Sequence, residues 1–250
     1  MEPIPTANHP LPSLASLQLQ YVGKKLEDLP TPAVVLDRAV VKKNCNAMLD
    51  VCDKLGVGFR AHVKSHKAGL PSCRTREHVL YGVPPAQCAI PRLLHLSSIL
   101  APGSLNILID NIDAFNKMSK ALVEGEIGVF IKIDTGYKRA GIKISSSKFP
   151  GLVRKVVGTV GETFRGFYSH YGHSYAGSSE KDAAHGLISE LEGLEEAAAE
   201  VDEVYLRLLK SKMVLTVGAT PTATAAQNML SGSPRAAEFK TLLNRLKETK

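Results

Sequence analysis

The sequence predicts an α/β fold, most simply a TIM-type (β/α) barrel, and two features of its patterning favour this class. Short apolar segments that suit strands alternate with longer segments whose apolar residues recur every three or four positions, as along one face of a helix. The repeated order of strand, helix and strand favours parallel pairing. The length of 250 residues is that of one barrel domain or two small domains.

The first predicted elements lie after a polar, proline-containing stretch. We expect residues 1–20 to form a loose tail, followed by a strand over 33–37 that ends at Asp37, a residue suited to cap a helix. The next segment is predicted to be a helix that ends near Gly56. Its apolar residues form an amphipathic stripe: Val41, Cys45, Met48, Cys52 and Leu55. A second strand follows at once and includes the basic residues near position 64.

The rest of the chain continues the alternation. Apolar runs predict four more strands, over residues 105–110, 128–134, 164–170 and 212–217. Helical spacing predicts helices over residues 112–122, 149–157, 183–199 and 235–247. These patterns give about six strands, so the expected barrel is incomplete, with its sites at the C-terminal ends of the strands.

Composition excludes several classes of protein. The net charge is +7 and the pI about 9.2, but the basic residues are scattered and no nucleic-acid signature occurs. No apolar run approaches the length of a membrane span, and the first 20 residues lack the pattern of a secretion signal. The four cysteines form no CxxC pair, so we expect no disulfide framework and a cytoplasmic location.

The most informative segment is the basic strand around Lys64. Side chains alternate between the faces of a strand, so Arg60, His62, Lys64 and His66 share one face. Their mutual repulsion lowers the pKa of Lys64, and a partly neutral lysine is what Schiff-base chemistry needs. The alternative, weighted about equally on this pattern alone, is an exposed basic sheet edge.

The residues of this strand, Arg-Ala-His-Val-Lys-Ser-His-Lys, resemble the lysine motif of the D-serine dehydratase and D-threonine aldolase family. Five further blocks follow in the family's order, over residues 29–37, 80–85, 132–141, 166–175 and 217–222. The family's enzymes use pyridoxal 5'-phosphate in a barrel of the alanine racemase N-terminal type. The sequences of these blocks are most similar to those of the fungal-type D-serine dehydratases. The resemblance assigns residues 21–230 to a pyridoxal-phosphate-binding barrel and leaves 231–250 as a basic terminal helix.

The resemblance also implies which residues form the site. Lys64 would carry the cofactor and act as base at the substrate α-carbon, with a surface lysine as the alternative. His62 would support Lys64 or be a hydrogen-bonded core histidine. Arg139 would contact the cofactor's phenolic oxygen, and His170 would lie against its ring. The remaining candidate cofactor ligands are Tyr175 and the turn formed by Gly218, Ala219 and Thr220, which suits a phosphate but is also an ordinary turn.

The implied function is D-serine dehydration to pyruvate and ammonia. The alternatives are a D-threonine aldolase and a non-catalytic pyridoxal-phosphate-binding barrel or inactive fragment. The family also uses zinc, held by a His-x-Cys pair in a C-terminal β-domain; no His-x-Cys occurs in this sequence, so we expect no metal ligands, no β-domain and impaired turnover. We further expect an internal deletion near residues 68–79. The family is homodimeric, and a D-amino acid is the expected partner, with neither nucleic acid nor membrane.

Overall fold

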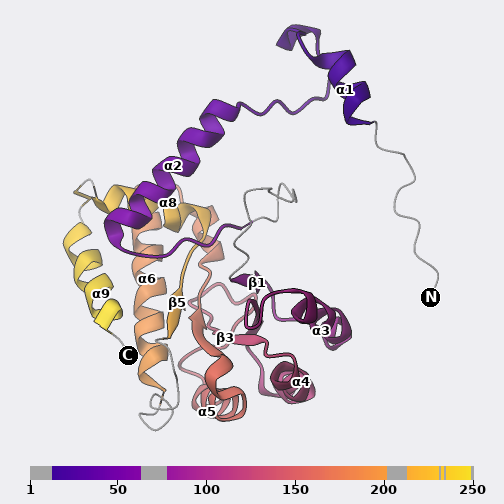
Figure 1. Ribbon diagram of the computed structural model, residues 1–250. Coiled ribbons are helices and arrows are strands. Elements are labelled where there is room, and N and C mark those ends of the chain that lie inside the picture. Colours follow the sequence, from indigo (N-terminus) through magenta and orange to yellow (C-terminus); the bar gives the residue numbers. More distant parts are fainter. Residues whose placement is uncertain (1–12, 63–77, 202–212, 231, 234, 249–250) are drawn as a thin grey trace. The chain divides into compact units, whose positions relative to one another are not determined.

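The computed structural model describes residues 13–62, 78–201, 213–230, 232–233 and 235–248 (Figure 1). The chain divides into two compact units, Met1–Asp50 and Val51–Lys250. Among the described residues, no helix has both the length and the apolar character that crossing a bilayer requires.

The first unit contains one helix, one short turn of 3-10 helix and the first part of a second helix, which continues beyond Asp50. Helix α1 (Leu14–Tyr21) begins where the Ser13 hydroxyl accepts a hydrogen bond from the Ser16 N–H at 3.1 Å. The turn η1 (Leu26–Asp28) follows, and then α2 (Arg38–Leu55). The Asp37 carboxylate accepts bonds from the first N–H groups of α2, at 2.7 Å from Ala39 and 3.1 Å from Val40, so the predicted cap is confirmed.

One expectation for the first unit is wrong, and another falls partly on described residues. Residues 14–20, expected to belong to a loose tail, lie in helix α1, which has no buried residue. No strand forms over residues 33–37, where Val34 is 91% exposed. A strand is stabilised by its ladder of partners, and these residues pair with no strand in the described part of the chain.

The second unit is built on a curled sheet of parallel strands. The strands are β1 (Val79–Tyr81), β2 (Leu105–Ile109), β3 (Gly128–Lys132), β4 (Phe164–Tyr168) and β5 (Val214–Thr216). They pair in that order, all in parallel, as a half-barrel (Figure 1). The parallel sheet and four of its strands are therefore confirmed.

The predicted number of strands, about six, is corrected to five within the described residues. Strand β1 was not expected, because it is only three residues long and follows a polar stretch; Val79 is exposed, and the other two residues are partly buried. Residues 59–62, the start of the predicted basic strand, have no regular secondary structure. The rest of that strand lies outside the described residues, as does nearly all of the segment where a deletion was expected.

Helices follow the strands and cover the outer face of the sheet. They are α3 (Ile90–Ile99), α4 (Ile112–Glu124), α5 (Phe149–Val160), α6 (Glu180–Ala199), α8 (Thr220–Leu230) and α9 (Ala236–Glu248), with short 3-10 turns η2 (Gln87–Ala89), η3 (Gly161–Thr163) and η4 (Gly172–Ala176). Four of these helices, α4, α5, α6 and α9, are confirmed predictions. Helix α6 begins with a capping box between Ser179 and Asp182. Helices α3 and α8 were not expected.

The core lies between the sheet and these helices. Outward-facing strand residues such as Ile107, Val129, Ile131 and Phe167, none of them exposed, form one cluster with the apolar faces of α4 and α5 and part of α6. A second cluster joins α6, α8 and α9, where Phe239 of α9 is buried. The opposite, concave face of the sheet carries a third, small cluster of Leu108, Phe130 and Tyr168. This concave face positions the candidate site.

Candidate functional site

The concave face changes from apolar to polar or charged at the ends of β2, β3 and β4. Alternation places Asp110 two residues beyond Leu108, Lys132 beyond Phe130 and His170 beyond Tyr168, on the same side of the sheet. The Nζ atom of Lys132 lies 4.8 Å from the centroid of the Tyr168 ring. Since parallel strands end at one edge, these polar groups gather where barrel folds carry their sites.

The described part of the basic segment reaches this face. The Arg60 Nη1 donates a hydrogen bond to the Thr216 hydroxyl at 3.2 Å, and its guanidinium lies 5.2 Å from the centroid of the Phe130 ring. The ring of His62 stacks on that of His170, with centroids 6.0 Å apart and an angle of 27° between the planes. The structure thus brings together His62 and His170, two predicted site residues. Lys64 and His66 lie outside the described residues.

His170 is held in one orientation by the loop after β5. Its Nδ1 lies 2.7 Å from the carbonyl oxygen of Gly218, and a carbonyl can only accept, so Nδ1 carries the proton. Burial is the main cause that lowers the pKa of His170, with smaller contributions from Lys132, His62 and Arg139. The neutral ring therefore presents Nε2 as an acceptor.

Lys132 and Tyr168 are titratable groups that the predicted site did not include. Burial, followed by the nearby Arg139, lowers the pKa of Lys132, while Asp110, Glu190 and Asp134 act in the opposite direction. Burial raises the pKa of Tyr168 to about 12, with a further contribution from Glu190. A lysine and a tyrosine at the buried end of apolar strands are the sequence signal that could have identified them.

The raised pKa of Tyr168 predicts a loss of stability in alkali. Between about pH 10, where an unfolded tyrosine ionises, and about 12, only the unfolded state loses this proton, so stability falls as the pH rises. The loss is on the order of 3 kcal/mol by pH 12 and absent below pH 10. Urea unfolding of the protein and of Tyr168→Phe across this range measures it. Parallel pH profiles for the two proteins would contradict the assignment.

The turn after β5 brings two further candidates together. The hydroxyl of Tyr175 accepts a bond from the Thr220 N–H at 3.2 Å and lies 3.0 Å from the Thr220 hydroxyl. The N–H of Ala219 donates to the Thr222 hydroxyl at 2.8 Å. Gly218 has a φ of +140°, and nothing lies within 4 Å of where its Cβ would be. The turn that leads into α8 thus contains a glycine with open space around it.

Arg139 lies in the loop after β3, at an exposed position. The Asp134 carboxylate shapes this loop by accepting bonds from the N–H groups of Gly136 and Lys138, each at 3.0 Å. The Arg139 guanidinium lies 4.8 Å from the centroid of the Tyr137 ring. A cavity of about 460 Å³ opens beside the loop, lined by Asp110, Asn111, Asp134, Lys138, Arg139, Ala140, Gly141 and Lys143. It lies at the C-terminal ends of β2 and β3.

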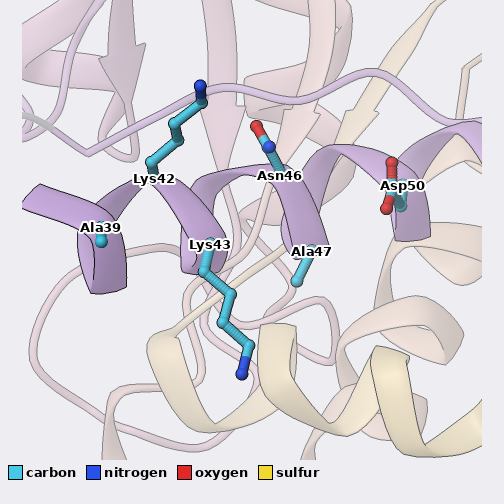
Figure 2. Close-up of a pocket in the computed structure, with 6 residues that line it drawn as sticks. All are labelled: Ala39, Lys42, Lys43, Asn46, Ala47 and Asp50. Carbon is cyan, nitrogen blue, oxygen red and sulfur yellow. The ribbon is translucent and has the colours of Figure 1, made fainter.

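Another hollow, of about 510 Å³, lies in the first unit on α2 (Figure 2). It is lined by Ala39, Lys42, Lys43, Asn46, Ala47 and Asp50. Lys42 and Lys43 point to opposite sides of the helix in Figure 2, so they do not converge on one ligand. None of the predicted site residues lines this hollow, and we assign it no function. Within the described residues, no group of three or more His, Cys, Asp or Glu side chains is arranged to hold a metal ion.

Sequence reasoning missed one buried carboxylate altogether. Glu190 of α6 has no exposed surface, and its Oε1 accepts bonds from the backbone N–H groups of Tyr171 and Gly218. The apolar residues of α6 predicted the helix but not an inward-facing glutamate. Gly186 and Gly193, on the same side of the helix, are the signal that could have indicated it, because small residues let a helix approach its neighbours.

Comparison with known proteins identifies the family. Residues 92–231, or 140 of 250, match the family described as alanine racemase, N-terminal domain. The chain is 34% identical to D-serine dehydratase of Schizosaccharomyces pombe over 83% of the chain and 57% of that protein. It is 31% identical to D-serine dehydratase of Saccharomyces cerevisiae over 82% of the chain and 59% of that protein.

Solved structures agree with this relationship. D-threo-3-hydroxyaspartate dehydratase from Delftia sp. HT23 superposes with a TM-score of 0.65 and 26% identity, over 79% of this chain and 57% of that one. The chain thus spans less than two thirds of the length of each of these relatives. Because the family match covers more than half of the residues, the chain belongs to the alanine racemase N-terminal domain family.

Proposed function

We propose that the chain binds pyridoxal 5'-phosphate on the concave face and acts as a D-amino-acid lyase of the D-serine dehydratase type. The observation that carries the proposal is the convergence of stacked His62 and His170 with the Gly218–Thr220 turn at one edge of the sheet. The relatives named D-serine dehydratase support the reaction. That this chain turns over a substrate, which substrate it uses and which partners it has are all part of the proposal.

The described residues fit an anionic, aromatic cofactor. The basic groups Lys132 and Arg139 lie near His170, Arg60 lies near Tyr168, and their charge suits a phosphate and a phenolate. The Thr220 N–H, at the start of α8, is bonded to the hydroxyl of the exposed Tyr175. A phosphate oxygen can take the place of that hydroxyl, since an anion is favoured at the N-terminus of a helix.

Four of the predicted residues have further roles in this proposal. Lys64 would hold the cofactor covalently and remove the proton from the substrate α-carbon. His170, fixed by the Gly218 carbonyl, would orient the ring, with His62 behind it. Arg139 would pair with the phenolic oxygen. The cofactor, when bound, supplies an electron sink that makes the α-proton removable.

The cavity beside Arg139 favours one alternative substrate. Three cations, Lys138, Arg139 and Lys143, line it with two carboxylates, Asp110 and Asp134, and the positive charge in excess suits a second substrate carboxylate. The related D-threo-3-hydroxyaspartate dehydratase is named for a substrate that carries one. A D-threonine aldolase activity and cofactor binding without turnover are the other outcomes to be distinguished.

We also propose a reducing, cytoplasmic location. Three cysteines, Cys45, Cys52 and Cys88, are free thiols in the described part of the chain, which suits a compartment where thiols stay reduced.

Product analysis tests the proposed function. The protein is incubated with pyridoxal phosphate and, separately, D-serine, L-serine, D-threonine or D-threo-3-hydroxyaspartate. We expect pyruvate and ammonia from D-serine and neither from L-serine. Glycine from D-threonine would indicate an aldolase instead, and oxaloacetate from hydroxyaspartate would favour the dicarboxylic substrate.

Binding is measured in the same samples. Pyridoxal phosphate that binds but supports no product from any of the four substrates would contradict the lyase reaction and leave the binding role. Binding is monitored by the absorption spectrum of the cofactor. Absence of binding would overturn the whole proposal.

A further inference from the structure

Glu190 joins the loops that follow two neighbouring strands. Its Oε1 accepts a hydrogen bond from the Tyr171 N–H at 2.7 Å, in the loop after β4. The same atom accepts one from the Gly218 N–H at 3.3 Å, in the turn after β5. The Ser169 hydroxyl, at the end of β4, donates to it as well, at 3.3 Å. One oxygen atom therefore binds the residues on both sides of His170, through the Ser169 hydroxyl and the Tyr171 backbone, and the backbone at Gly218.

The connection extends to the loop after a third strand. The Ser169 hydroxyl also lies 2.8 Å from the hydroxyl of Thr135, three residues beyond the end of β3. A continuous chain of hydrogen bonds thus runs from Glu190 through Ser169 to Thr135. The loops after β3, β4 and β5 are the ones that carry Arg139, His170 and the Gly218–Thr220 turn.

The surface of α6 is shaped to admit this carboxylate. Gly186 lies four residues before Glu190, and a Cβ there would come within 2.8 Å of the Tyr171 ring. Gly193 lies three residues after it, and a Cβ there would come within 2.8 Å of Thr135 Cγ2. Both positions are on the same side of the helix as Glu190. The two glycines bring the helix backbone close to the strand ends, and Glu190 spans the remaining gap.

Burial of a carboxyl group costs several kcal/mol unless it is hydrogen-bonded, so packing alone does not explain Glu190. Burial raises the pKa of Glu190, while the nearby Thr222 hydroxyl and the bonds from Tyr171, Gly218 and Ser169 act to lower it. An acceptor oxygen at this point satisfies the N–H groups of Tyr171 and Gly218 in either protonation state. Acceptor geometry, more than charge, is what the side chain supplies.

We propose that Glu190 is a positioning residue that holds His170 and the Gly218 turn in the arrangement needed to receive the cofactor's ring and phosphate. Gly218 is held from both sides, since its N–H donates to Glu190 and its carbonyl accepts from His170 Nδ1. Without the Glu190 acceptor, the turn loses one of these bonds and His170 loses its fixed partner. The inference rests on the proposed cofactor binding for its functional consequence.

The test compares two substitutions of equal length. Glu190→Gln keeps an acceptor oxygen, whereas Glu190→Met keeps the volume and removes it. We expect the Kd for pyridoxal phosphate, measured by titration of the cofactor spectrum, to rise at least about tenfold in Glu190→Met, the consequence of losing on the order of 1.4 kcal/mol. Glu190→Gln should stay within about threefold of the unchanged protein. Glu196→Gln, at an exposed position of the same helix, is the matched control.

A second readout needs no cofactor. The proton on His170 Nδ1 should give a hydrogen-bonded imidazole NMR signal in the unchanged protein and in Glu190→Gln, and this signal should weaken or disappear in Glu190→Met. Cofactor binding that is equal in all three proteins, together with an unaltered signal, would overturn the positioning role. Failure of every protein to bind the cofactor, with the NMR difference intact, would instead overturn the proposed function alone.

Hydrogen exchange of the unchanged protein tests the same proposal if Glu190→Met does not fold. The amide protons of Tyr171 and Gly218 should exchange as slowly as those of β4, because a buried acceptor holds them. Exchange as rapid as that of exposed loop amides would contradict the proposal.

Discussion

Replacing Gly166 by alanine is expected to cost about 4 kcal/mol of stability, a large part of the roughly 5–15 kcal/mol available to a typical domain. Gly166 lies in β4 with a φ of +126°, and a Cβ there would come within 2.3 Å of the Val214 carbonyl oxygen in β5. A side chain would be strained at this φ, at a cost of about 1–3 kcal/mol. It would also separate the two strands, and each buried backbone group left unpaired costs about 1–3 kcal/mol.

Urea unfolding of Gly166→Ala and Gly151→Ala measures this effect against a matched control. Gly151 lies in α5 with nothing within 4 Å of its Cβ position, so alanine there should leave stability unchanged or raise it by up to about 1 kcal/mol. Equal midpoints for the two variants would show that β4 and β5 do not approach as closely as described. Displacement of β5 in Gly166→Ala should also weaken cofactor binding, since β5 leads into the Gly218 turn.

Removing the amino group of Lys64 is expected to abolish covalent capture of pyridoxal phosphate. No other side chain can form the same bond from the same position, so Lys64→Ala should lose the absorption band of the bound cofactor. The phosphate turn and the stacked histidines remain, so weak, reversible binding should persist. Titration of the cofactor spectrum measures both effects.

Lys67→Ala is the matched control for this substitution, since it removes a lysine from the same motif and should leave the band unchanged. A band of full intensity in Lys64→Ala would contradict the role given to this lysine.

Local patterns predicted most of the second unit and failed where structure depends on distant partners. The runs over 105–110, 128–134 and 164–170 are apolar enough to identify β2, β3 and β4. Strand β1 has only three residues, none of them fully buried, and its place in the sheet is set by pairing with β2. The reverse error occurred at residues 33–37, an apolar run that forms no strand because it has no ladder partner in the described part of the chain.

In the candidate site, too, local motifs were predictable and contacts between distant segments were not. Motif resemblance pointed to His62, His170, Tyr175 and Thr220, and the structure places these as two contacting pairs. Glu190 was not predicted, because its role depends on contacts between a helix and loops more than 15 residues away in sequence. The spacing of apolar residues shows which face of α6 is apolar. It does not show which strands this face contacts.

Peptide mapping after borohydride reduction tests the central claim most directly. The protein is saturated with pyridoxal phosphate, reduced, digested and analysed by mass spectrometry for the lysine that carries the reduced cofactor. We predict that the modified peptide contains Lys64. Lys132 is the informative competitor, because it is a buried lysine on the concave face whose pKa is lowered. Modification of Lys132 in place of Lys64, or of many surface lysines without preference, would contradict the account.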